Sequence, residues 1–183
     1  ARWDLDKTYL RTEFDTLRDI VRTAFERADE KRTNPGAGTL MREMVKAGNE
    51  VHVLSGSPEQ MRKRIEEKLR LDGVTWHSLT LKPNLKNLLR LRIRAVKDQL
   101  GYKLPMLLAA RSELQLPEGQ ALPHETLFGD DSEADVFVYA LFADFLSGRI
   151  TEELIVEVME RGLVYEDVIE HTLASMRGIG RGN

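Results

Sequence analysis

Short apolar segments that each end in small or acidic residues constrain the fold of this chain most. Residues 51–54 form a β-branched run that ends at Ser55, and residues 126–128 lead into Gly129 and Asp130. A third segment starts almost at residue 1 and ends near Asp4. Helical patterns separate these segments, and such alternation is typical of βαβ units in an α/β protein. Because the carboxyl ends of parallel strands share one edge of the sheet, we expect these polar residues to meet there.

Hydrophobic periodicity and chain breakers predict the other elements. Gly48 is an expected helix end, Pro58 suits the first turn of a helix, and residues 101–103 are an expected break between two helices. The expected helices cover residues 14–28, 39–47, 58–71, 85–100, 105–113 and most of 133–175. With a further strand over residues 74–81, we expect a parallel sheet of about four or five strands, the first strand central and helices on both faces.

Composition excludes several classes of protein. Hydrophobic residues make up 42% of the 183 residues and charged residues 31%, which is typical of a globular domain. The net charge of −3 provides no basic field, so no nucleic-acid partner is expected. The absence of cysteine excludes disulfides and thiolate chemistry, and the four histidines show no metal-ligand spacing such as HExxH. Since no transmembrane run or signal peptide is visible, we expect a cytoplasmic location.

Acidic residues gather at two of the expected strand ends. Asp4 and Asp6 are two residues apart, and on a strand they would project from the same face. Asp130 and Asp131 end a later strand, and Asp135 follows shortly after. Carboxylates held this close together need a cation to remain ionised, and Mg²⁺ suits oxygen ligands. A lone Asp-x-Asp would more often cap a turn, but the joint pattern predicts a Mg²⁺ site.

Four sequence motifs in register resemble those of the haloacid dehalogenase superfamily of phosphohydrolases. They are Asp-Leu-Asp-Lys-Thr from Asp4 to Thr8, Ser55, a lysine before a late helix, and Gly-Asp-Asp-Ser-Glu-Ala-Asp from Gly129 to Asp135. The resemblance implies a three-layer Rossmann-like parallel sheet with a small or absent cap, the cap being an insertion that covers the active site. It also implies a catalytic core at residues 1–148, followed by a helical C-terminal segment at residues 149–183.

The resemblance implies that Asp4 is a nucleophile that forms an aspartyl-phosphate, and that Asp6 is the general acid and base. Thr8 would help to fix Asp6 or the loop that carries it. Ser55 would hold a phosphoryl oxygen at the start of a helix, where the helix dipole favours an anion. The backbone N–H groups of the two substrate-binding residues, Gly56 and Ser57, would complete that phosphate site.

The same resemblance assigns the metal ligands. Mg²⁺ would bind the carboxylates of Asp4 and Asp130 and the backbone carbonyl of Asp6. Asp131 would ligate the ion, directly or through water, and Asp135 would orient the ligands.

Three lysines could supply the cation that offsets charge in the transition state. Lys82 follows the third expected strand directly and precedes a proline. Lys97 falls in a helical pattern, where a solvated face is the simpler interpretation. Lys103 lies between two expected helices, close to the last strand in the chain, and is the favoured candidate.

A finer resemblance is to the actin-patch-associated phosphatidate phosphatase family. It lies in residues 51–60, with a Ser-x-Ser-Pro turn, in the pair Tyr102–Lys103, and in residues 129–139. Asp131 and Val136 depart from that family's pattern at its Ser and Pro positions. The expected substrate is therefore phosphatidate or another phosphomonoester of a lipid or small molecule.

Two features bear on partners. Between residues 82 and 103 there is one acidic residue, Asp98, against seven basic residues, and apolar residues are interleaved with them. The basic residues are Lys82, Lys86, Arg90, Arg92, Arg94, Lys97 and Lys103. Such a helix could make peripheral contact with an anionic membrane, or it could be a core helix with a solvated basic face. A small cap would favour a macromolecular or membrane-bound substrate. The alternatives are a protein or nucleic-acid-end phosphatase of the same superfamily, and a non-catalytic interaction module on this fold.

Overall fold

The computed structural model describes residues 1–11, 27–83, 95–114, 123–131 and 134–179. The chain divides into two compact units. The first unit comprises residues 1–90 and 125–130, and the second comprises residues 91–124 and 131–183. The boundary expected between residues 148 and 149 falls inside the second unit, between two of its helices, and it stays a prediction.

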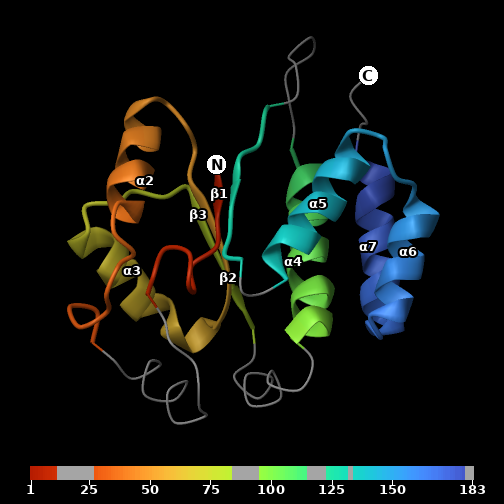
Figure 1. Ribbon diagram of the computed structural model, residues 1–183, viewed down its shortest axis with the longest axis horizontal. Coiled ribbons are helices and arrows are strands. Elements are labelled where there is room, and N and C mark those ends of the chain that lie inside the picture. The colour runs from red at the N-terminus through yellow and green to blue at the C-terminus, as the bar shows by residue number, and fades with distance from the viewer. Residues whose placement is uncertain (12–26, 84–94, 115–122, 132–133, 180–183) are drawn as a thin grey trace. The chain divides into compact units, whose positions relative to one another are not determined.

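The first unit is built on a parallel sheet, as predicted (Figure 1). Within the described residues its four strands are β1 (Arg2–Trp3), β2 (His52–Pro58), β3 (Ser78–Lys82) and β4 (Leu127–Phe128), in the order β3-β2-β1-β4. All three neighbouring pairs are parallel, and β1 lies inside the sheet, which confirms its expected central place. The protein is therefore of the α/β class and is compatible with a Rossmann-like fold.

Helices α2 (Ala37–Lys46) and α3 (Arg62–Leu71) cover this sheet and bury the core of the first unit. Met41 of α2 and Ile65 and Leu69 of α3 pack in one cluster with strand residues such as Trp3 and Val53. The predicted end of α2 is confirmed, because Gly48 follows it with φ 84, a left-handed conformation that glycine adopts without steric cost. The second layer of helices that a three-layer arrangement needs stays a prediction.

The predicted start of a helix at Pro58 is wrong. Strand β2 runs on to Pro58, the short 3₁₀ helix η1 (Glu59–Met61) follows, and α3 begins at Arg62. Strand β3 also begins later than expected, at Ser78, since residues 74–77 are a connection whose Val74 is buried in the core. Proline is compatible with a strand end as well as with a helix start, so sequence alone did not distinguish the two.

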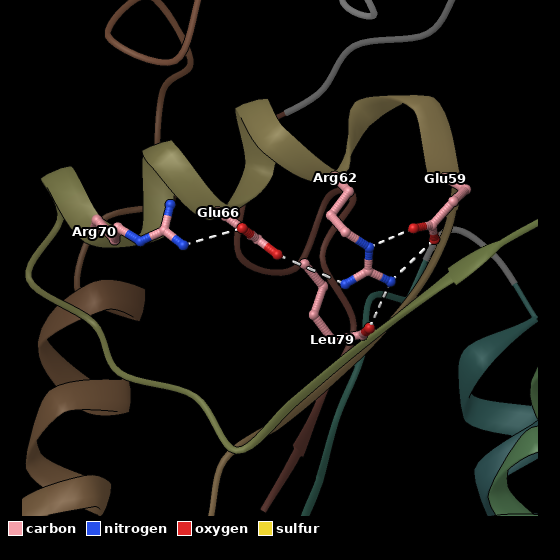
Figure 2. A network of polar contacts seen from close by, with 5 residues as sticks. All are labelled: Glu59, Arg62, Glu66, Arg70 and Leu79. Atoms are coloured by element: carbon pink, nitrogen blue, oxygen red, sulfur yellow. Dashed lines mark hydrogen bonds and ion pairs between the residues drawn. The ribbon is translucent and has the colours of Figure 1, made fainter.

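A polar network fixes the start of α3 against the sheet (Figure 2). The Arg62 guanidinium donates to Glu59 and, through Nη2, to the carbonyl oxygen of Leu79 at 3.0 Å. Its Nη1 lies 3.7 Å from Glu66 Oε1, and Arg70 donates to Glu66 Oε2 at 3.0 Å. The hydrogen bond to the Glu59 carboxylate raises the pKa of Arg62 above its usual range. Arg62 therefore ties the segment after β2 to strand β3.

The second unit is helical within its described residues (Figure 1). Its helices are α4 (Ala95–Ser112), α5 (Asp135–Leu146), α6 (Glu152–Arg161) and α7 (Glu166–Gly178). Helix α4 packs against the other three. The expected helical region at residues 133–175 is therefore three helices, which turns around Gly148 and Gly162 separate.

The predicted break at residues 101–103 is wrong, because α4 passes through it without interruption and contains Pro105. A Cβ atom at Gly101 would lie 3.3 Å from Val164 Cγ1, so this glycine permits close packing against the connection between α6 and α7. The buried residues Leu100, Leu104 and Leu108 hold the helix on both sides of the proline. Tertiary packing therefore overrides a local preference for a break.

Several sequence predictions lie outside the described residues. They are most of the helix expected at residues 14–28 and most of the basic stretch at residues 82–103. Among the helices that the structure describes, none combines the length and the apolar character needed to cross a membrane.

Candidate functional site

Parallel pairing brings Asp4 and Asp130 to the same edge of the sheet. Trp3 at the end of β1 pairs with Val53 of β2 on one side and with Phe128 of β4 on the other. The residues that follow these three positions therefore emerge side by side at the carboxyl edge. The backbone N–H of Asp4 donates to the carbonyl oxygen of Phe128 at 2.8 Å, which extends the β1–β4 pairing up to the carboxylate. The predicted convergence of strand ends is confirmed.

The carboxylates of Asp4 and Asp130 lie close together and away from solvent. Each has an oxygen within 4.8 Å of an oxygen of the other, and the two residues are only 2% and 8% exposed. Two ligand oxygens on opposite sides of Mg²⁺ are about 4.2 Å apart, twice the usual Mg–O distance. Like charges buried this close repel each other, and a divalent cation between them would remove that cost. The pair fits a hard divalent ion.

Asp6 is held by two serine hydroxyl groups of strand β2. Ser57 Oγ donates to Asp6 Oδ2 at 2.7 Å, and Ser55 Oγ donates to the same oxygen at 3.1 Å. Ser55 Oγ also accepts the backbone N–H of Ser57 at 2.9 Å, which fixes the two serines relative to each other. The first and second predicted motifs are therefore joined by direct hydrogen bonds to a carboxylate.

The expected placement of Ser55, Gly56 and Ser57 at the start of a helix is wrong, because all three belong to β2. The pairing of β2 with β3 shifts register between Ser55 and Pro58, an irregularity of the β-bulge kind. A bulge re-aims side chains at a strand end, and here both serine hydroxyls turn toward Asp6. Side chains at an irregular strand end therefore form this part of the site.

A tight turn follows Asp6. The carbonyl oxygen of Leu5 accepts the backbone N–H groups of Tyr9 at 3.0 Å and Leu10 at 2.7 Å. Lys7 adopts φ 63, the left-handed conformation that non-glycine residues rarely take. Strained backbone persists only where its surroundings hold it, and such positions cluster at functional sites.

Asn34 holds this turn, and sequence reasoning missed it. Its Nδ2 donates to the carbonyl oxygens of Lys7 and Thr8, both at 2.8 Å. Its backbone N–H donates to the carbonyl oxygen of Tyr9 at 2.8 Å. In the sequence Asn34 stands in Thr-Asn-Pro-Gly, which indicates only a chain break. The Thr8 hydroxyl makes no hydrogen bond within the described residues, so the observed link from Thr8 to the turn is its carbonyl.

Asp72, at the end of α3, anchors the other side of the turn. Its carboxylate accepts the Tyr9 hydroxyl at 2.6 Å, the Thr33 hydroxyl at 2.7 Å and Lys68 Nζ at 2.7 Å. Burial raises the pKa of Asp72, but the bonds from Lys68, Tyr9 and Thr33 outweigh it and hold that pKa below its usual value. Burial raises the pKa of the Tyr9 hydroxyl well above its usual value, and the hydrogen bond to Asp72 is the second largest cause of this rise.

The second unit holds two further predicted residues as a buried ion pair. Lys103 Nζ, in α4, donates to Asp135 Oδ1 at the start of α5, and both side chains are almost completely buried. Of the other lysine candidates, Lys82 ends strand β3, and the side chain of Lys97 is not among those described. Asp131 is exposed, and it is the first residue of this unit's second segment. A lysine this deep in the protein requires such a carboxylate partner.

No known protein family, curated protein or solved structure matches this chain.

Proposed function

We propose that the protein is a Mg²⁺-dependent phosphomonoester hydrolase of the haloacid dehalogenase type, which acts through an aspartyl-phosphate on Asp4. The observation that carries this proposal is the buried pair of Asp4 and Asp130 beside an Asp6 that two serine hydroxyls orient. A parallel sheet with β1 inside supports the proposed core.

In the first half-reaction a carboxylate oxygen of Asp4 attacks phosphorus. The bond from phosphorus to the ester oxygen breaks, and Asp6 gives its proton to the leaving alkoxide. Asp4 suits this role because the β1–β4 hydrogen bond fixes its backbone at the sheet edge. When bound to Asp4 and Asp130, Mg²⁺ would supply positive charge next to the phosphoryl oxygens.

In the second half-reaction Asp6 takes a proton from a water molecule, whose oxygen attacks phosphorus. The bond between phosphorus and Asp4 then breaks, and inorganic phosphate leaves with Asp4 regenerated. A carboxylate that serves as acid and then as base must keep one position in both steps. The bonds from Ser55 and Ser57, together with the turn that Asn34 holds, support that requirement.

The proposal includes the remaining predicted residues. Lys103 would offset negative charge on the phosphoryl group, as the family resemblance implies. Asp135 would hold its ammonium group in place, and the buried ion pair of these two residues supports that second role. Asp131 would contribute to the metal site through water, in keeping with its exposure. Phosphatidate or another phosphomonoester is the proposed substrate, and residues 82–103 are proposed for peripheral membrane contact.

Metal titration of an Asp130→Asn variant tests the Mg²⁺ site. Since the amide is a weaker Mg²⁺ ligand than the carboxylate, we expect the Mg²⁺ concentration for half-maximal hydrolysis to rise at least tenfold, with activity partly regained at high Mg²⁺. The matched control is Asp144→Asn in α5, which breaks an exposed ion pair with Arg149 and should leave this concentration unchanged. Hydrolysis that persists in a chelator, or an unchanged Mg²⁺ requirement in Asp130→Asn, would contradict the proposed site.

A further inference from the structure

Two histidines that lie far apart in the sequence meet at the amino edge of the sheet. His52 begins β2, and His77 directly precedes β3. The pairing of His52 with Ser78 sets the two strand starts side by side, and the backbone N–H of His77 donates to the carbonyl oxygen of Val51 at 2.6 Å. The imidazole rings are 4.9 Å apart between centroids and tilted by 55°. The parallel register therefore forms a histidine pair that no local motif indicates.

Glu50 places a carboxylate near both rings. Its Oε2 lies 3.5 Å from His52 Nε2, and its Oε1 lies 3.8 Å from His77 Nδ1. Neighbouring ligand atoms around a tetrahedral metal ion are about 3.3 Å apart when the metal–ligand distance is about 2.0 Å. The two nitrogen–oxygen separations are only slightly longer than that, but each histidine faces a different oxygen of Glu50, and the three ligand atoms do not all lie within 4.8 Å of one another. Glu50 and His77 are largely exposed, so their side chains are free to rotate toward His52 when an ion binds.

The far side of the His52 ring has a partner of its own. His52 Nδ1 lies 2.8 Å from Ser78 Oγ. When this nitrogen donates its proton to the hydroxyl, the Nε2 lone pair faces Glu50. Histidines that ligate metals almost always donate their other N–H to such a partner, which fixes the ring and the tautomer. The half-buried His52 side chain is therefore already oriented for ligation, before any metal is bound.

We propose that Glu50, His52 and His77 form a binding site for a divalent transition metal such as Zn²⁺, with water as the fourth ligand. The donor set separates this site from the carboxyl edge of the same sheet: two imidazoles and one carboxylate suit Zn²⁺, whereas carboxylates alone suit Mg²⁺. A bound ion would join the connections that precede β2 and β3. The site does not depend on the phosphatase proposal.

Calorimetric titration with Zn²⁺ of the protein without a polyhistidine tag tests this site. We expect a saturable Zn²⁺ site in the wild type that is distinct from the Asp4–Asp130 pair, and at least tenfold weaker binding at that site in His52→Ala and in His77→Ala. Ser78→Ala removes no ligand, yet it should weaken binding about tenfold because the His52 ring loses its orientation. His171→Ala, at an exposed histidine of α7, is the matched control and should bind Zn²⁺ as the wild type does.

Two further variants keep the result interpretable. Glu50→Gln changes an exposed side chain before β2 and should weaken Zn²⁺ binding without disturbing the fold, which circular dichroism would check. Asp130→Asn should leave Zn²⁺ binding at the histidine site unchanged, because Asp130 lies at the other end of the strands. No Zn²⁺ binding by the wild type, binding insensitive to both histidines, or binding lost only in Asp130→Asn would overturn the proposal.

Discussion

The carboxylate of Asp6 shows how much of the candidate site sequence could predict at the scale of single residues. The spacing of Asp4 and Asp6 after a short strand indicated paired carboxylates, and the convergence of Asp4 with Asp130 followed from parallel topology. Sequence could not predict the hydrogen bonds from Ser55 and Ser57 to Asp6, nor those from Asn34 to the turn that follows Asp6. They depend on a strand irregularity and on a loop conformation, neither of which has a periodic signal in the sequence.

Ser57→Ala is predicted to lower kcat/KM about tenfold. The substitution removes the shorter of the two hydroxyl bonds to Asp6, and a hydrogen bond to a charged group contributes about 1.5–3 kcal/mol. Ser57→Thr retains a hydroxyl and should recover most of the activity, which separates loss of the bond from general disruption. Equal steady-state rates for the wild type and Ser57→Ala would show that this bond does not orient Asp6.

At the scale of elements, the strands were the best-predicted features and the helix boundaries the least. Residues 51–54 and 126–128 have β-branched or aromatic runs with clear breakers, and both form strands. The break expected before Pro105 failed because packing of leucines and a close approach at Gly101 stabilise one continuous helix. Local breakers report only local preference, whereas helix ends also depend on what packs against them.

The anchor at Asp72 makes a prediction about stability and pH. The pKa of Asp72 is lower in the folded state than its ordinary value of 3.8. Its contribution to stability is therefore complete above the unfolded-state pKa and is lost as the pH falls through the folded-state pKa. We expect Asp72→Asn to have a lower melting temperature than the wild type near pH 7. When the pH is lowered below about pH 4, the melting temperature of the variant should fall less than that of the wild type. Parallel curves for the two proteins would contradict this role.

The ion pair between α4 and α5 separates structural from catalytic roles. Lys103→Met removes the ammonium group from a buried ion pair, so we expect a loss of roughly 3–5 kcal/mol in the free energy of unfolding, measured by chemical denaturation. The double variant Lys103→Met/Asp135→Leu should recover most of that stability, because apolar side chains can replace a buried pair. Phosphatase activity should remain lost in the double variant. Restored stability with restored hydrolysis would show that the pair is only structural.

For the whole molecule, the central claim is that a buried carboxylate at the sheet edge attacks phosphorus. Chain topology supports it, since β1, β2 and β4 each deliver part of the site to one edge of the first unit. Sequence predicted this arrangement because strand order and carboxyl ends follow from βαβ connections. It could not predict the division of the chain into two units, because that division depends on which segments pack together in the folded chain.

The most direct test compares the wild type with Asp4→Asn in hydrolysis of a panel of phosphomonoesters that spans lipids, sugar phosphates, nucleotides, phosphopeptides and para-nitrophenyl phosphate, with Mg²⁺ present. We expect the wild type to release phosphate from at least one class, and Asp4→Asn to lose roughly a thousandfold or more in kcat while it stays folded, since an amide cannot attack phosphorus. Wild-type rates in Asp4→Asn would contradict the aspartyl-phosphate route, and no hydrolysis of any ester by the wild type would contradict the proposed activity itself.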